Sequence, residues 1–215
     1  MKKIFFLILI LMMPLLSFFH PGLPLTHDGE IQVARIASFY QSLSEGNIVP
    51  RWAGNLNWGY GTPILMFVYP LPSYAASFFH FLGFSFIDSA RAVFILGFIF
   101  SGLFMSLWIK EIWGWPAGLV AGLLYTLAPY RFVDLYVRGA LGENFAFIWP
   151  PLVCWLALRL SKGWRWRHFA GASLALAALI LSHNMLSLMF LPVIFGYLGY
   201  LIFVSKKKWL LVIRY

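Results

Sequence analysis

The stretch at residues 89–109, SARAVFILGFIFSGLFMSLWI, decides the fold class of this protein. Arg91 is its single charged residue, and a run of about 20 apolar residues is what a helix needs to cross a bilayer. Further apolar segments occur at 1–19, 117–133, 144–160, 168–183 and 185–204. The sequence therefore predicts an all-α, polytopic membrane helix bundle with about six spanning helices.

The composition supports the membrane class and excludes several others. Hydrophobic residues make up 61% of the 215 residues and charged residues only 11%. Soluble domains are about half apolar and about a quarter charged. The net charge of +9 predicts basic cytoplasmic loops rather than nucleic-acid binding. Cys154 is the one cysteine, which excludes an intrachain disulfide and a multi-cysteine metal site.

The basic loops predict the orientation. Lys2 and Lys3 keep the N-terminus in the cytoplasm. If residues 62–82 also crossed the bilayer, the basic stretches 161–167 and 205–208 would lie outside, against the positive-inside rule. Prolines at positions 63, 70 and 72 interrupt helical hydrogen bonding. The segment 62–82 is therefore predicted to be juxtamembrane or re-entrant, where protein or water covers irregular backbone.

The expected organisation in the cytoplasmic membrane has four parts. Residues 1–19 form the first transmembrane helix, and 20–88 an extracytoplasmic loop with an amphipathic helix and the juxtamembrane segment. Residues 89–204 form the transmembrane bundle, and 205–215 a cytoplasmic tail or the start of a truncated helix. This topology places the unusual polar residues on one outer face: Asp28, Glu30, Arg35, Arg51, Asp134, Arg138, Glu143, His183 and Asn184.

The outer loop contains PLTHDGEI at 24–31, with two acids ahead of an amphipathic helix at 28–45. One interpretation is structural, because Asp is a favoured N-cap and acids in a first turn gain from the helix dipole. The other is chemical, with Asp28 as a catalytic base and Glu30 supporting it. Because His27 and His20 lie nearby, a divalent cation at Asp28 and Glu30 is a further alternative.

The remaining candidates are substrate-binding residues, each with a structural alternative. Arg138 and Glu143 lie in DLYVRGALGEN at a predicted membrane boundary, where charges mark a site or a paired network. Arg138, and likewise Arg51, could grip a phosphate with the fixed fork of guanidinium donors, or form an interfacial salt bridge. His183 and Asn184 either cap and bridge helices or offer a donor pair to an outer cavity.

The sequence has no G-x-x-x-x-G-K loop, no G-x-G-x-x-G after a strand, no G-x-S-x-G elbow and no H-E-x-x-H helix. A cytoplasmic nucleotide-using enzyme is therefore unsupported.

Three stretches carry a resemblance to known proteins. They are RWAGNLNWGYGTPILMFVYPLPSYAA at 51–76, DLYVRGALGENFAFIWPPLV at 134–153 and LSHNML at 181–186. With NIVPRW and FSFIDSARAVFIL, the chain resembles the N-terminal half of GT-C-type integral membrane glycosyltransferases. It is most similar to bacterial membrane proteins called 6-pyruvoyl-tetrahydropterin synthase-related. The soluble pterin synthase binds zinc through histidines, and this sequence has no matching histidine cluster.

The resemblance implies transfer of a sugar from a polyprenyl-phosphate donor at the outer face. It makes Asp28 the acid that activates an acceptor, and Asp28-Gly29-Glu30 departs from the frequent adjacent Asp-Glu pair. It also implies that this chain is the N-terminal part of a longer protein. The alternative is a non-catalytic transporter of lipid-linked glycans or a membrane assembly partner, in which the same charges bind headgroups without chemistry.

Overall fold

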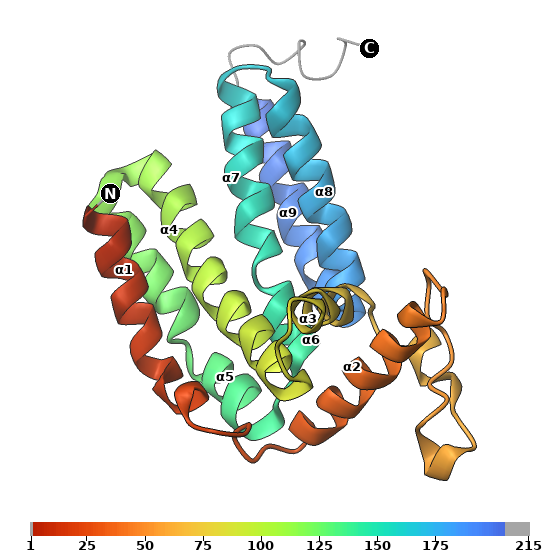
Figure 1. The fold of residues 1–215 in the computed structure, drawn as a ribbon. Coiled ribbons are helices and arrows are strands. Elements are labelled where there is room, and N and C mark those ends of the chain that lie inside the picture. The colour runs from red at the N-terminus through yellow and green to blue at the C-terminus, as the bar shows by residue number, and fades with distance from the viewer. Residues whose placement is uncertain (1, 205–215) are drawn as a thin grey trace.

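The computed structural model describes residues 2–204, and they form a bundle of helices with shorter helices across one end (Figure 1). Within this range the only β-pairing is an isolated bridge between Ala53 and Thr62. The α-helices are α1 Lys2–Met12, α2 Gly29–Ser44, α3 Leu71–Phe81, α4 Phe86–Thr126, α5 Pro129–Phe132, α6 Leu141–Ala146, α7 Trp149–Lys162, α8 Trp166–Ser182 and α9 Asn184–Val204. Short 3-10 helices are η1 Met13–Phe19, η2 Asn57–Gly59 and η3 Pro63–Met66, and η4 Val133–Arg138 is a π-helix. The all-α prediction is confirmed.

The helix α4 is a hairpin with a break at Gly114. This glycine has φ 83° and ψ 176°, a backbone conformation that side chains disfavour. Beyond the break the chain folds back on itself. A Cβ on Gly118 would lie 2.8 Å from Lys110 Cβ, and one on Gly122 would lie 2.7 Å from the Gly102 carbonyl oxygen. Small residues thus let the two arms of α4 touch, as they do in membrane helix pairs.

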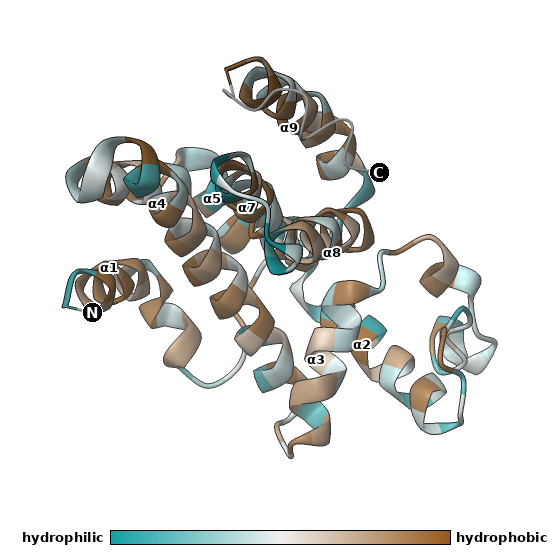
Figure 2. Ribbon diagram, turned by 90° about the horizontal axis from the view of Figure 1, so that it is seen from above, coloured by the Kyte–Doolittle hydropathy of each residue, from teal (hydrophilic) through white to brown (hydrophobic). Residues whose placement is uncertain are grey.

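Four helical stretches are long and apolar enough to cross a membrane: Lys2–Phe19, Phe86–Thr126, Leu141–Lys162 and Asn184–Val204. The helix α9 buries only 17% of its span inside the bundle, and Met185, Leu188 and Met189 are exposed. Figure 2 shows apolar residues along α1, α8 and α9, with α9 at the edge of the molecule. A helix that is apolar all round without protein to cover it faces lipid. The chain is a helical membrane bundle, and six crossings stay a prediction.

The outer loop contains the amphipathic helix that the sequence predicts. The helix α2 buries Ile36 and Phe39 and leaves Glu30, Ile31 and Gln41 exposed. The segment 62–82 contains no spanning helix, because α3 has only 11 residues. In Figure 1 α3 is seen end-on while α7, α8 and α9 run lengthwise. It therefore lies across the end of the bundle, packed on α2, α4 and α6.

Charged residues gather at the two ends of the bundle. At one end, which we call the basic end, Glu111 near the end of the first arm of α4 pairs with Lys162 of α7 at 3.4 Å. Figure 1 places the N-terminus and the α7–α8 turn there too. The opposite end, which we call the outer end, holds α2, α3, α5 and η4. The expected tail 205–215 lies outside the described residues.

The region 117–143 differs from its prediction. The expected helix 117–133 ends at Thr126, because Pro129 starts the separate helix α5. The segment 134–143, which the sequence places at a membrane boundary, is wound into η4 and α6, joined by Gly139 at φ 67°. Asp134 and Glu143 are consequently buried, at 0% and 5% exposed.

Candidate functional site

The acid-bearing outer loop is docked on the arginine-bearing turn. The backbone N–H groups of His27 and Asp28 donate to the carbonyl oxygens of Val137 and Arg138, both at 2.9 Å. Gly139 permits this approach, because a Cβ there would lie 2.9 Å from Thr26 Cβ and 3.1 Å from the Gly29 nitrogen. Two of the segments singled out in the sequence thus form one surface at the outer end.

Side chains next to this contact form a charged group that we call the Arg138 cluster: Tyr130, Asp134, Arg138 and Glu143. The Arg138 Nη1 donates to Glu143 Oε2 at 2.6 Å, to Tyr130 Oη at 3.0 Å and to Asp134 Oδ1 at 3.3 Å. The Tyr130 hydroxyl in turn donates to Glu143 Oε1. The Arg138 side chain is 40% exposed and its Nε and Nη2 have no hydrogen-bond partner among residues 2–204. The cluster therefore offers guanidinium donors to a ligand from the outer end.

Asp134 is the buried acid of this cluster. Burial, together with the negative charge of Glu143, raises the pKa of Asp134 to about 8, although the positive charges of Arg131 and Arg138 lower it. Its Oδ2 is buried without a hydrogen-bond partner among the described residues. A carboxyl group in this state holds a proton near neutral pH, so the cluster contains a proton that a reaction or a ligand could use.

Arg131 lies beneath the cluster and was not predicted as a site residue. It is 2% exposed, donates from Nη2 to Ser101 Oγ at 3.2 Å and sits 4.2 Å from the centre of the Phe147 ring. Its Nε and the Oδ1 of Asn144 are buried without partners in the described part of the chain. An arginine inside the apolar segment 117–133 was the sequence signal for it, since ionisable residues in such segments are rare.

The Asp28 side chain does not cap the helix α2. Asp28 occupies the N-cap position of α2 but makes no side-chain capping bond, and the Gly29 N–H donates instead to Thr26 Oγ1 at 3.1 Å. Glu30, in the first turn of α2, lines a cavity of about 240 Å³ with apolar walls that include Leu23, Val33 and Ile87. Glu30 thus lies beside a cavity that fits an apolar chain with a polar end, and Asp28 is not among the residues that line it.

His183 caps a helix, which was the structural alternative for it. Its Nδ1 accepts from the Leu186 N–H at 3.1 Å, and its ring lies 4.4 Å from that of Tyr69. Burial lowers the pKa of His183, while Glu143 raises it and Arg138 lowers it. The ring is therefore neutral with its proton on Nε2, a donor close to the cluster. Asn184 is exposed and begins α9.

Arg51 does not join the cluster. It follows the C-terminal end of α2, where Ala53 packs with Phe39, whereas Asp28 precedes the N-terminal end. A helix of 16 residues is about 24 Å long, so α2 separates the two. The Arg51 side chain is exposed.

The described residues, 2–204, contain no group of three or more His, Cys, Asp and Glu side chains that could hold a metal ion. Asp28 and Glu30 are the two acids that the sequence put forward for a divalent cation, and His20 and His27 do not complete a site with them.

No family model matches the chain, and the search of solved structures found no match. An uncharacterized protein of Lactococcus lactis subsp. cremoris (strain MG1363) is 26% identical over 189 residues. The similarity covers 86% of this chain and 30% of that protein, so the chain spans about 30% of the relative's length.

Proposed function

We propose that this chain is part of a GT-C-like membrane glycosyltransferase that takes a sugar from a polyprenyl-phosphate donor at the extracytoplasmic face. The observation that carries the proposal is the docking of the Asp28 loop on the Arg138 turn through two backbone hydrogen bonds of 2.9 Å. It brings a half-exposed acid next to an arginine that keeps free donors. Those are the two groups that acceptor activation and phosphate binding require.

In this proposal the donor phosphate binds Nε and Nη2 of Arg138, since a guanidinium fork suits phosphate oxygens. His183 adds its Nε2 proton. Asp28 is the general base, and Glu30 orients the acceptor at the mouth of its apolar cavity. The cavity of about 240 Å³ is small, and it fits the first units of a lipid chain rather than a whole polyprenyl tail.

The six-crossing topology belongs to the same proposal. The two arms of α4 would cross separately, as would the apolar helix Trp166–Ser182, which is shorter than the four long spans. The basic end would then be cytoplasmic and the Arg138 cluster external, as the positive-inside rule requires.

The test is sugar transfer by the full-length protein reconstituted in vesicles with a polyprenyl-phosphate sugar. Asp28→Asn should lower kcat by about a hundredfold or more, because general bases contribute that much. Glu45→Gln is the matched control. It removes an exposed acid at the other end of α2, where Glu45 accepts only from Gln41 at 3.1 Å, and should leave kcat unchanged. Full activity of Asp28→Asn would reject the base assignment.

A second function has its own observation in its favour. The carboxylates of Asp28 and Glu30 make no hydrogen bond or ion pair within residues 2–204, so no neighbour orients either of them for catalysis. A transporter or assembly partner for lipid-linked glycans would need only the binding groups. Binding of the polyprenyl-phosphate sugar without transfer, and its weakening in Arg138→Lys, would favour this function.

A further inference from the structure

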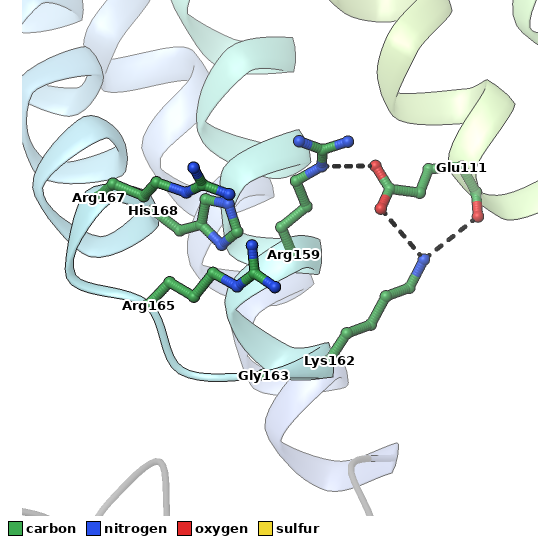
Figure 3. A pocket seen from close by; sticks show the side chains of 7 residues that line it. All are labelled: Glu111, Arg159, Lys162, Gly163, Arg165, Arg167 and His168. Carbon is green, nitrogen blue, oxygen red and sulfur yellow. Dashed lines mark hydrogen bonds and ion pairs between the residues drawn. The ribbon is translucent and has the colours of Figure 1, made fainter.

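Another cavity, lined mainly by charged residues, lies at the basic end. Its volume of about 440 Å³ is within the range of small-molecule sites. We call it the basic pocket, and its charged and imidazole side chains are Glu111, Arg159, Lys162, Arg165, Arg167 and His168. Figure 3 shows Arg165, Arg167 and His168 on one side of a space, Glu111 and Lys162 on the other, and Arg159 reaching Glu111 between them.

Glu111 neutralises only part of this positive charge. Its Oε2 accepts from Arg159 Nε at 3.0 Å, and its Oε1 lies 3.4 Å from Lys162 Nζ. The side chains of Arg165 and Arg167 make no ion pair with any described residue, and Arg159 keeps both Nη atoms free. The pocket thus carries an excess of cations that converge on one space.

His168 adds a buried donor or acceptor to the pocket wall. The residue is 8% exposed, and its Nδ1 is buried with no hydrogen-bond partner among residues 2–204. An unpaired buried polar atom is costly unless something binds it. A basic loop that served only to orient the chain in the membrane would need neither a buried imidazole nor a cavity.

An apolar groove of about 590 Å³ continues from the basic pocket along the bundle. The two share Lys162, and the groove is walled by Ile112, Trp113, Tyr200 and Leu201 from α4 and α9. A cationic cavity that opens on an apolar groove between membrane helices is complementary to an anionic phospholipid, with the headgroup in the cavity and an acyl chain in the groove.

We propose that the basic pocket and the apolar groove form a binding site for one anionic phospholipid. Its phosphate headgroup binds Arg165, Arg167 and the free Nη atoms of Arg159, and an acyl chain fills the groove. The site lies at the opposite end of the bundle from the Arg138 cluster and does not depend on the function proposed there.

The experiment measures dissociation constants of the purified full-length protein for dihexanoyl phosphatidylglycerol, dihexanoyl phosphatidylcholine and inorganic phosphate, from tryptophan fluorescence. Phosphatidylglycerol should bind at least about tenfold more tightly than either other probe. The double variant Arg165→Gln/Arg167→Gln should bind it about thirtyfold more weakly, given the usual contribution of each basic residue at an anionic lipid surface. Ile112→Asn should weaken the binding of phosphatidylglycerol about fivefold and leave the binding of inorganic phosphate unchanged.

The matched control is Lys2→Gln/Lys3→Gln, which removes the same charge from the basic end outside the pocket. Phosphatidylglycerol binding unchanged by this control supports the site. If the two double variants weaken phosphatidylglycerol binding equally, the loss comes from net charge alone, and the proposed site is overturned. Inorganic phosphate bound as tightly as phosphatidylglycerol would assign the pocket to a soluble anion instead. If the pocket double variant does not fold, Arg167→Gln alone should still weaken binding about fivefold.

Discussion

Arg138 at the outer end and Arg159 at the basic end form similar ion pairs with different consequences. Both side chains are 40% exposed, and both pair with carboxylates within 3.0 Å. The partners of Arg138, the side chains of Asp134 and Glu143, are only 1% and 7% exposed, whereas that of Glu111 is 22% exposed. The burial of the acid, rather than that of the arginine, therefore sets what each pair does for the fold.

The difference extends from stability to function. At the outer end two buried acids share one arginine, so their protonation and any ligand of Arg138 are linked. At the basic end an excess of arginine faces an open pocket and is available to an external anion. Similar residue types thus place two buried acids around one arginine at one end and an excess of arginines, unpaired among residues 2–204, around an open pocket at the other.

The largest effect we predict is all-or-none and concerns which side of the membrane each end faces. In a Cys154→Ser background, a membrane-impermeant maleimide added outside intact cells should label Asn184→Cys and not Arg165→Cys. Both positions are exposed, and Cys154 itself is buried. External labelling of Arg165→Cys alone would invert the orientation and end the proposal of an external Arg138 cluster.

Next in size is the loss of each arginine. Arg138→Met should lower the free energy of unfolding by about 3 kcal/mol, because it strips the cation from the buried Glu143 carboxylate. Arg159→Met should cost at most about 1 kcal/mol, because Glu111 keeps Lys162 and the Trp155 indole N–H, at 2.6 Å. Chemical unfolding in detergent micelles measures both. If both variants lost the same free energy of unfolding, the burial of the acidic partner would not explain the difference between the two ion pairs.

A pair of glycines compares backbone packing at the two ends. Gly139→Ala should destabilise the protein by about 2 kcal/mol, since it adds a Cβ at positive φ against Thr26. Gly163→Ala, in the α7–α8 turn, has extended backbone with φ 179° and no atom within 4 Å of the new Cβ. It should be neutral in the same unfolding measurement. A neutral Gly139→Ala would show that the Asp28 loop is not held against the turn.

The smallest predicted effect is a pH dependence that comes from the outer end. Because burial raises the pKa of Asp134 to about 8, the folded state holds a proton that the unfolded chain releases above about pH 4. The stabilisation is fully present below that pH and is lost as pH rises through about 8. Between about pH 7 and about pH 9 the free energy of unfolding should fall by about 1 kcal/mol.

The variant Asp134→Asn should remove this pH dependence, whereas Asp88→Asn, an acid paired with Arg91 at 2.6 Å outside the cluster, should keep it. A dependence that persists in Asp134→Asn would assign the proton to another group.

Much of the fold could be predicted from the sequence, because hydropathy and proline placement act locally. Apolar runs marked the long helices, prolines marked the interrupted segment 62–82, and the basic loops marked one end. The amphipathic helix expected at 28–45 corresponds to α2, which buries Ile36 and Phe39.

The site was predicted less completely, because it depends on contacts between distant segments. The sequence left Asp28 as either a helix cap or a catalytic base, and Thr26 takes the capping role once the loop docks on Gly139. It grouped Arg51 with Arg138, although α2 separates Arg51 from Asp28, which docks on the Arg138 turn. It placed Asp134 and Glu143 on the outer face at a membrane boundary, but it did not show that packing of η4 and α6 buries both.

By itself, the sequence determined that this protein lies in a membrane, and it fixed the positions of the charges along the chain. Too many apolar side chains are present for water to accommodate, and charges between apolar runs must collect at helix ends. The tertiary structure alone decided which charges meet. It set Asp134 and Glu143 against Arg138 and left Arg165 and Arg167 without a partner in the described chain. Ion pairing and pKa depend on distance and burial in space, which spacing along the chain does not specify.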